Sequence, residues 1–393
     1  YRAAIDAAGE TASTELLEDA AMANYMIARY DRAIEFQGEV LRRLSDGDDI
    51  PRLGDGWRRL SRFRWTAGDI ISARVDGDKA VDILKDHEGP ELALAYMNVS
   101  QLRMLAYSGD DAVPPAERAI ELAKRFDRPD ITAQATQNIA GARIYADPEQ
   151  AERLMAQSVT MALENGDAEA AARGMANWSY IYWWRFRYLE GREICRKHEP
   201  YSAEQELDGY HDYHAGTLAL FELELGNLEE AEYWIQRTTA PADVHLQGWH
   251  QFPGTVAHAR WRLRTGRPDD PTVSDYLARY LRLAKESQRV APIAELNAER
   301  AWVEGKDHTP AIEEILSVID MAPRSETIAY MRVWLHRLGA GDRDLEVNDL
   351  VPEPHRSELS GDPRKAADLW KDRKAPYNRA FALAFSGDAA SRK

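Results

Sequence analysis

A spacing of 39 or 40 residues runs through most of the sequence. At each interval a small residue stands near the start of the second helix of a predicted helical pair. An interval of this length is typical of one supersecondary unit that has been copied and stacked. Because a single unit cannot bury its apolar face, the stack itself is the expected fold. The positions are Ala33, Ala73, Ala112, Ala151, Gly191, Ala231 and Ala311, with Pro271 in the same place between the last two.

Within the units the apolar residues follow a helical period. Leu92, Val99 and Leu102 fall on one face of a predicted first helix, and Ala116 and Ala119 do so on the following one. No segment alternates with a period of two for long enough to form a sheet. The sequence therefore predicts an all-α fold, an α-solenoid of stacked helical hairpins with roughly sixteen to twenty helices in a right-handed superhelix.

The regular units extend over residues 1–323, which we expect to form one superhelical repeat domain. Beyond Pro323 the pattern predicts one helix over 324–338, a polar and acidic connection over 339–354, and helices over 360–371 and 376–385. We expect residues 324–393 to be irregular capping repeats that continue the same solenoid, because the outer face of a last repeat meets water.

The charge of the chain limits its partners. Acidic residues outnumber basic ones by 66 to 50, a formal net charge of −16, which would repel a phosphate backbone. We expect no direct nucleic-acid binding by this segment. The most apolar uncharged run, Gly174 to Trp184, is also much shorter than the about 20 residues of a membrane span. Because the chain begins at Tyr1 rather than Met, we expect a longer polypeptide or unnumbered first residues.

The only cysteine, Cys195, excludes an intrachain disulfide and a cysteine-based zinc site. It lies in a predicted helix, where a packed side chain is more common than a nucleophile. A reducing cytoplasm is the expected location. No metal site is expected either, although His211, His214, His245 and His250 lie close together in the sequence.

The paired-helix unit with a Gly-x-x-x-x-Ala hinge, as in Gly68 to Ala73 and Gly226 to Ala231, resembles an extended tetratricopeptide repeat. The segments WRRLSRFRWTAGD and GDPRKAADLWKDRKAPYNRAFALAFSGD are also similar to the helical-repeat region of large LuxR-family, MalT-like transcriptional regulators. This resemblance implies a sensor or scaffold between a nucleotide-binding module and a helix-turn-helix. Neither flanking module lies in this sequence, which has no GxxxxGK[ST] loop, and we expect no cofactor.

Polar residues recur at one position of the predicted first helices, which would line the concave groove. Asn98, Asn138 and Asn177 stand there, and Arg59 takes the same place in an earlier unit. Asparagine is a mediocre helix former, so its recurrence needs a physical reason. The amides could bind an extended peptide or a polar ligand, or they could bond a neighbouring helix of the stack.

Aromatic residues are dense in the fifth unit, NWSYIYWWRFRY. Helical geometry places Tyr180, Trp183 and Trp184 on the face of Asn177, and Tyr213 follows in the next unit. Such a cluster suits a pocket that grips a ligand, or it fills the superhelix interior.

Arginines gather on one helix of this acidic chain. Arg59 and Arg62 could clamp a carboxylate or phosphate, or could pair with acids of adjacent repeats. No set of nucleophile, base and acid is visible, so catalysis is not expected, although a site assembled from distant helices would escape notice.

These features predict a sensor or scaffold repeat domain of a transcriptional regulator that binds a small molecule, a peptide or a protein in its groove. The alternative is a stand-alone interaction scaffold without a DNA-binding module.

Overall fold

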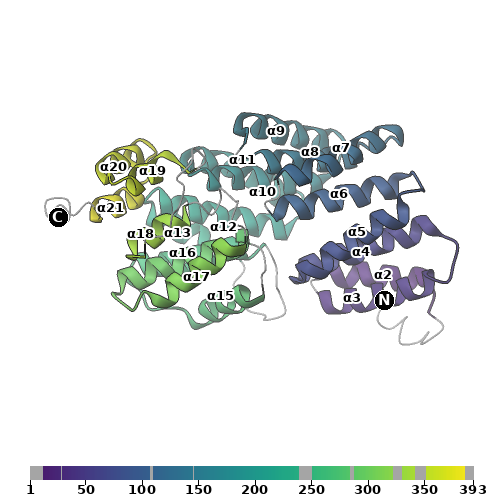
Figure 1. The fold of residues 1–393 in the computed structure, drawn as a ribbon, viewed down its shortest axis with the longest axis horizontal. Helices are drawn as coiled ribbons and strands as arrows, with labels where there is room; N and C mark the ends of the chain where they lie inside the picture. Colours follow the sequence, from purple (N-terminus) through teal and green to yellow (C-terminus); the bar gives the residue numbers. More distant parts are fainter. Residues whose placement is uncertain are drawn as a thin grey trace. The chain divides into compact units, whose positions relative to one another are not determined.

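The computed structural model describes residues 12–27, 29–106, 109–144, 146–238, 250–283, 287–321, 330–340 and 351–385. These residues form twenty helices and no strand, which confirms the predicted all-α repeat fold (Figure 1). The helices are α2 (Thr14–Met26), α3 (Tyr30–Leu44), α4 (Ile50–Ala67), α5 (Ile70–Leu84), α6 (Pro90–Leu105), α7 (Gly109–Arg125), α8 (Pro129–Arg143), α9 (Pro148–Glu164), α10 (Ala168–Trp184), α11 (Tyr188–Glu204), α12 (Asp208–Glu224), α13 (Leu228–Ile235), α14 (Phe252–Arg264), α15 (Pro271–Leu283), α16 (Ser287–Val303), α17 (Thr309–Met321), α18 (Met331–Arg337), α19 (Glu353–Leu359), α20 (Pro363–Asp372) and α21 (Pro376–Ala384).

The recurring small residues mark the close approach of paired helices. In six units the small residue is the fourth residue of the second helix, as Ala73 is in α5 and Gly191 in α11. Ala73 is fully buried, and a Cβ atom added to Gly191 would lie 2.4 Å from Cζ of Phe221. The seventh unit departs from the prediction because Pro271 begins α15, so that Ser274 is the fourth residue there. Proline is favoured at this first position, since its missing N–H is not needed.

Side chains and left-handed residues define the helix ends. The carboxylate of Asp49 accepts a hydrogen bond from the backbone N–H of Arg52 at the start of α4, and Asp69 does the same for Ser72 in α5. Gly68 ends α4 with φ of +93°, a conformation that favours glycine. The turn between α4 and α5 is therefore short, as the sequence predicts.

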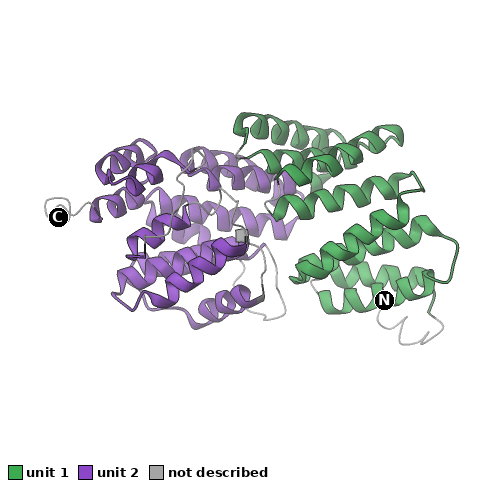
Figure 2. Ribbon diagram, viewed as in Figure 1, with its two compact units in different colours: residues 1–171, 243–249, 283–285 green, residues 172–242, 250–282, 286–393 purple. Residues whose placement is uncertain are grey.

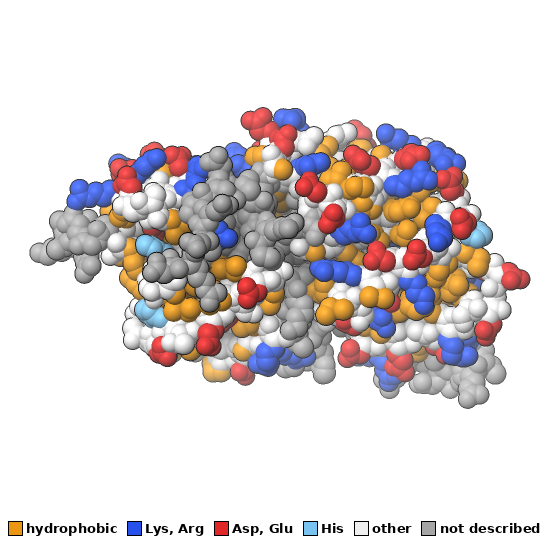
Figure 3. All heavy atoms as spheres, in the orientation of Figure 1, with side chains coloured by type: hydrophobic (Ala, Val, Ile, Leu, Met, Phe, Trp, Pro, Cys, Tyr) orange, Lys and Arg blue, Asp and Glu red, His pale blue; other side chains and the backbone are white. Residues whose placement is uncertain are grey.

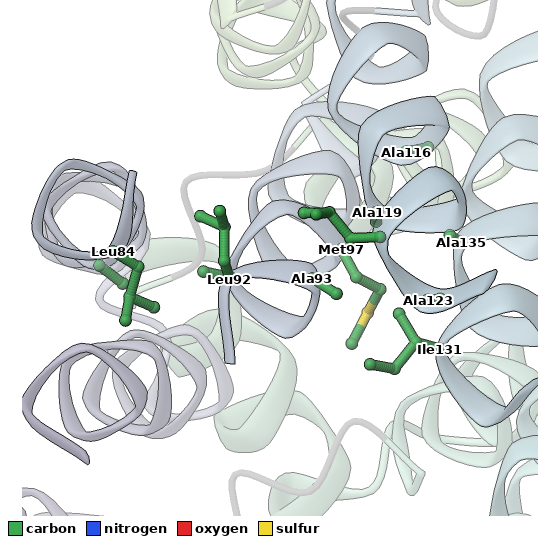
Figure 4. Packing of buried hydrophobic residues seen from close by; sticks show 12 residues of the cluster. Leu84, Leu92, Ala93, Met97, Ala116, Ala119, Ala123, Ile131 and Ala135 are labelled. Atoms are coloured by element: carbon green, nitrogen blue, oxygen red, sulfur yellow. The ribbon is translucent and has the colours of Figure 1, made fainter. Parts of the chain in front are cut away.

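The chain divides into two compact units (Figure 2). Unit 1 comprises residues 1–171, 243–249 and 283–285, and unit 2 comprises the remainder. The described helices of unit 1 are α2 to α9 and the first turn of α10. They form hairpins, and the first helices α4, α6 and α8 also pack on one another. The core of unit 1 joins successive hairpins: Leu84 and Leu92 meet between α5 and α6, and Met97 and Ile131 between α6 and α8 (Figure 4).

Unit 2 starts with the same arrangement, because α12 packs on α14 and α14 on α16. Its last helices then return to the first. The Arg373 guanidinium after α20 donates to the carbonyl oxygen of Arg185 at the end of α10, 188 residues earlier. The sequence analysis missed α19, which lies partly within the predicted connection over 339–354, because a helix of only 7 residues gives little periodicity.

The described surface carries both signs of charge. Lysine and arginine alternate with aspartate and glutamate over the visible face (Figure 3). Within the described ranges, no helix is long and apolar enough to cross a bilayer.

Candidate functional site

A charged face runs along α4 in unit 1. It consists of Asp55, Arg58, Arg59 and Arg62, which fall on one side of the helix because they are three or four residues apart. We call it the α4 arginine face. The Arg58 Nε donates to Oδ1 of Asp55 at 2.6 Å, and the Arg59 Nε donates to Oδ2 at 2.7 Å.

The aspartate neutralises only part of this face. Burial raises the pKa of Asp55, but the adjacent Arg58 and Arg59 outweigh burial and hold it below its usual value. The carboxylate is therefore charged at neutral pH. The face itself contributes one carboxylate and three guanidinium groups. The side chain of Arg59 is 34% exposed, so solvent or a ligand can reach it.

Arg62 extends the face to neighbouring helices. Its Nη1 donates to Oε1 of Gln101 in α6 at 3.1 Å. It also lies near Tyr25 of α2. Burial alone would raise the pKa of this phenol, but the positive charge of Arg62 and the hydrogen bonds of the phenol outweigh burial, and the pKa is below its usual value. Arg58 and Arg59 thus pair within their own helix, whereas Arg62 also bonds an amide of the next repeat.

The recurring asparagines of unit 1 bond between repeats. The Asn98 Nδ2 donates to Oγ of Ser61 in α4 at 2.9 Å, and the Asn138 Nδ2 donates to the carbonyl oxygen of Met97 in α6 at 3.0 Å. Both side chains are buried. Of the two alternatives from the sequence, these contacts favour inter-repeat bonding. Asn177 belongs to unit 2, where it is partly buried.

The aromatic residues of α10 lie in the interior of unit 2. Trp183 is 8% and Trp184 is 4% exposed, and of the two alternatives from the sequence this burial favours side chains that fill the interior. The ring centroid of Trp184 lies 5.4 Å from that of Tyr180 and 5.9 Å from that of Tyr330. Trp183 contacts Phe221 at 5.8 Å. The cause is the return of the C-terminal helices, which sequence periodicity does not show.

Tyr213 of α12 is partly buried in the same unit. Burial raises the pKa of its phenol. The predicted site residues therefore belong to different units: Asn98, Asn138, Arg59 and Arg62 lie in unit 1, whereas Asn177, Tyr180, Trp183, Trp184 and Tyr213 lie in unit 2.

A buried charge network in unit 2 escaped the sequence analysis. Arg264 of α14 pairs with Glu299 of α16 at 2.9 Å and with Glu224 of α12 at 3.0 Å. Arg260 pairs with Glu224 at 3.1 Å and also contacts Glu295. Burial disfavours charge on Glu299, but the two arginines outweigh it and lower the pKa of this carboxyl. Three successive first helices are thus joined by ion pairs.

The histidines are bound by other partners. His211 Nδ1 lies 3.0 Å from Oε1 of Glu199, and His214 Nδ1 lies 3.2 Å from Oγ of Ser202. His245 lies outside the described residues. Within the described ranges, no three histidine, cysteine, aspartate or glutamate side chains are grouped to hold a metal ion. Cys195 is buried, and burial raises the pKa of its thiol, which suits a packed side chain.

Solved structures share this fold. A Rap conjugation gene regulator of the plasmid pLS20, solved with a Phr peptide, is 13% identical, with 79% of this chain and 95% of that chain covered and a TM-score of 0.53. A Rap protein complexed with competence and sporulation factor is 12% identical, with 85% and 99% covered and a TM-score of 0.50. No protein-family model and no curated protein matches the sequence. The likeness shows a helical-repeat fold of the tetratricopeptide type.

Proposed function

We propose that the chain is a peptide- or protein-binding repeat domain, and that the α4 arginine face binds a carboxylate of the partner. The observation that carries this proposal is the cluster of three arginines on a partly exposed helix face of an acidic chain. Guanidinium groups bind carboxylates through paired hydrogen bonds. The Phr peptide in the similar Rap conjugation gene regulator supports a peptide partner.

We infer separate roles for the residues of the face. Asp55 orients Arg58 and Arg59 through their Nε atoms, which leaves the terminal nitrogens of Arg59 directed away from that bond. Gln101 holds Nη1 of Arg62 one repeat further along. Two guanidinium groups positioned in this way can bind one carboxylate group between α4 and α6. Such binding needs no nucleophile or cofactor, so we propose a binding domain rather than an enzyme.

Selection from a random heptapeptide library tests the proposal. We expect the full chain to enrich peptides with aspartate, glutamate or a free C-terminal carboxylate. Arg59→Ala and Arg62→Ala should each weaken a selected peptide by about tenfold or more, since a hydrogen bond to a charged group contributes about 1.5 to 3 kcal/mol. Titration calorimetry measures the change in Kd.

The matched control is Arg32→Ala on α3. Arg32 pairs with Glu35 at 2.6 Å on an exposed surface, much as Arg58 pairs with Asp55. This variant should keep the affinity of the original chain. Enrichment without acidic groups, or equal binding by Arg59→Ala, contradicts the proposal.

We also propose that this domain serves as the sensor of a transcriptional regulator. The support is the resemblance of its repeat segments to LuxR-family, MalT-like regulators. The reading frame provides the test. A coding segment for a helix-turn-helix beyond Lys393 supports the regulator, and a stop codon there supports the stand-alone scaffold.

A further inference from the structure

Helix α21 lies against the buried charge network of unit 2. The Tyr377 hydroxyl donates to Oε1 of Glu299 at 2.9 Å, and the Asn378 Nδ2 donates to Oε2 of Glu224 at 2.8 Å. The guanidinium carbon of Arg264 also lies 3.7 Å from the centroid of the Tyr377 ring. Two adjacent residues of α21 thus bond carboxylates of α16 and α12.

One turn later α21 becomes apolar. The ring centroid of Phe381 lies 5.0 Å from that of Trp302 in α16 and 5.2 Å from that of Trp334 in α18. Phe385 contacts Trp302 at 5.2 Å. We call the surface formed by Glu224, Glu299, Arg264, Trp302 and Trp334 the α21-binding face. It offers two acceptors at one end and two indole rings at the other.

The backbone of α12 leaves room for the start of α21. Gly226, directly after α12, has φ of +80°, and a Cβ atom there would lie 2.7 Å from Cγ of Pro376. Any larger residue would be strained and would collide with the first residue of α21. Backbone shape and side-chain chemistry therefore both fit this one helix.

A helix that only covers a repeat end does not require these polar contacts. Buried ion pairs lose much of their Coulomb energy to desolvation, and apolar residues of similar volume would often be as stable. The Oε2 atom of Glu224 instead needs a donor from whatever covers it, because the two arginines bond the Oε1 atom and a buried acceptor without a partner is costly. The face is thus selective for a helix that carries donors one turn before an aromatic residue.

We propose that the α21-binding face is a helix-binding groove that the chain keeps filled with its own α21, and that a partner protein binds there by presenting an amphipathic helix of the same chemistry. The partner helix offers a hydroxyl or amide donor to Glu299 and Glu224, and a phenylalanine between Trp302 and Trp334. Helix α21 is then a built-in competitor that lowers the affinity for the partner. This site lies in unit 2 and is independent of the carboxylate site proposed for unit 1.

A synthetic peptide of residues 374–385, labelled with a fluorophore, serves as the partner helix. The test compares the full chain with its Tyr377→Phe/Asn378→Ala variant, which loses both donors and keeps the aromatic ring. We expect the peptide to bind the variant at least about tenfold more tightly, because the weakened α21 vacates the face more often. Fluorescence anisotropy measures the two Kd values.

Two controls isolate the contacts. Arg379→Ala changes an exposed residue of α21 and should leave peptide binding as in the original chain. A peptide with Asn378→Ala and Phe381→Ala should not bind the double variant. Equal peptide affinity for the double variant and the original chain overturns the proposal, as does tight binding of the altered peptide.

Hydrogen exchange tests the original chain if the double variant does not fold. With the 374–385 peptide at saturating concentration, we expect the amides of α21 to lose protection while those of α13 keep theirs. Unchanged protection of α21 means that it is a permanent cap, and the proposal is then wrong.

Discussion

The interiors of the two units differ although the same kind of hairpin builds both. In unit 1 the charges of α4 remain partly exposed, and the side chain of Arg59 keeps 34% of its accessible surface. In unit 2 the first helices α12, α14 and α16 bury their charges, and the side chain of Arg264 keeps 4% of its accessible surface. The difference is what packs against the first helices: α21 and the aromatic residues of α10 fill unit 2.

This contrast separates two uses of polar residues on a repeat surface. The α4 arginine face is partly exposed, which suits an external ligand. The glutamates of the α21-binding face already have donors within the chain. Residue types alone do not distinguish these cases, because both regions combine arginines with acidic residues.

The largest expected effect is on the tryptophans. Trp184→Ala should lower the free energy of unfolding by about 3 to 5 kcal/mol, since a buried ring leaves a cavity in unit 2. Trp57→Ala in unit 1 should cost about 1 to 2 kcal/mol, because Trp57 is only partly buried beneath the ammonium of Lys79 at 3.5 Å. Urea denaturation measures both. A small loss for Trp184→Ala would restore it as a groove residue.

Acid should destabilise unit 2 before unit 1. Burial lowers the pKa of His198 to about 4 and that of His214 to about 3, from 6.5. The unfolded chain therefore binds protons that the folded unit does not, and stability is complete above pH 6.5 and falls as the pH drops below it. Between pH 7 and pH 5 the loss should be about 2 kcal/mol for each histidine.

Hydrogen exchange at the two pH values locates this loss. We expect faster exchange in α11 and α12 of unit 2 at pH 5. Equal acceleration in α4 to α9 would contradict the assignment. Replacing His214 by glutamine should reduce the pH dependence.

The smallest effect concerns the asparagines of unit 1. Asn138→Ala removes a buried hydrogen bond to the carbonyl oxygen of Met97 and should cost about 1 to 2 kcal/mol of stability. Asn165→Ala, on an exposed turn, should cost less than about 0.5 kcal/mol. Peptides selected as described above should bind Asn138→Ala unchanged. Weaker peptide binding with unchanged stability would return Asn138 to the ligand site.

Local rules explain why the sequence predicts the repeats well. A small residue at the fourth position of α5 or α9 indicates a close approach of two helices, and Asp49 and Asp69 indicate where helices begin. Both features are predictable because they depend on residues only a few positions away. The same rules identify the position of Asn98 and Asn138 but not whether a helix or a ligand accepts their hydrogen bond.

The residues missed in unit 2 depend on contacts far along the chain. The burial of Trp184 follows from Tyr330, which periodicity within α10 cannot reveal. The charge network did leave a trace in the sequence. Arg260 and Arg264 are four residues apart on one face of a first helix, and Glu295 and Glu299 have the same spacing on the next first helix, so the two pairs can meet between neighbouring repeats.

The hydrogen bond between Arg373 and the carbonyl oxygen of Arg185 also constrains the order of assembly. During synthesis the ribosome releases the chain from its N-terminus, so α10 emerges long before the helix it must contact. The helices α2 to α9 mainly contact helices that are close in the sequence, so they can pack soon after they emerge, because closing a short loop costs little entropy. Trp184 of α10 can contact Tyr330 only after a further 145 residues have been synthesised, and during this interval part of its apolar surface is open to chaperones and to aggregation.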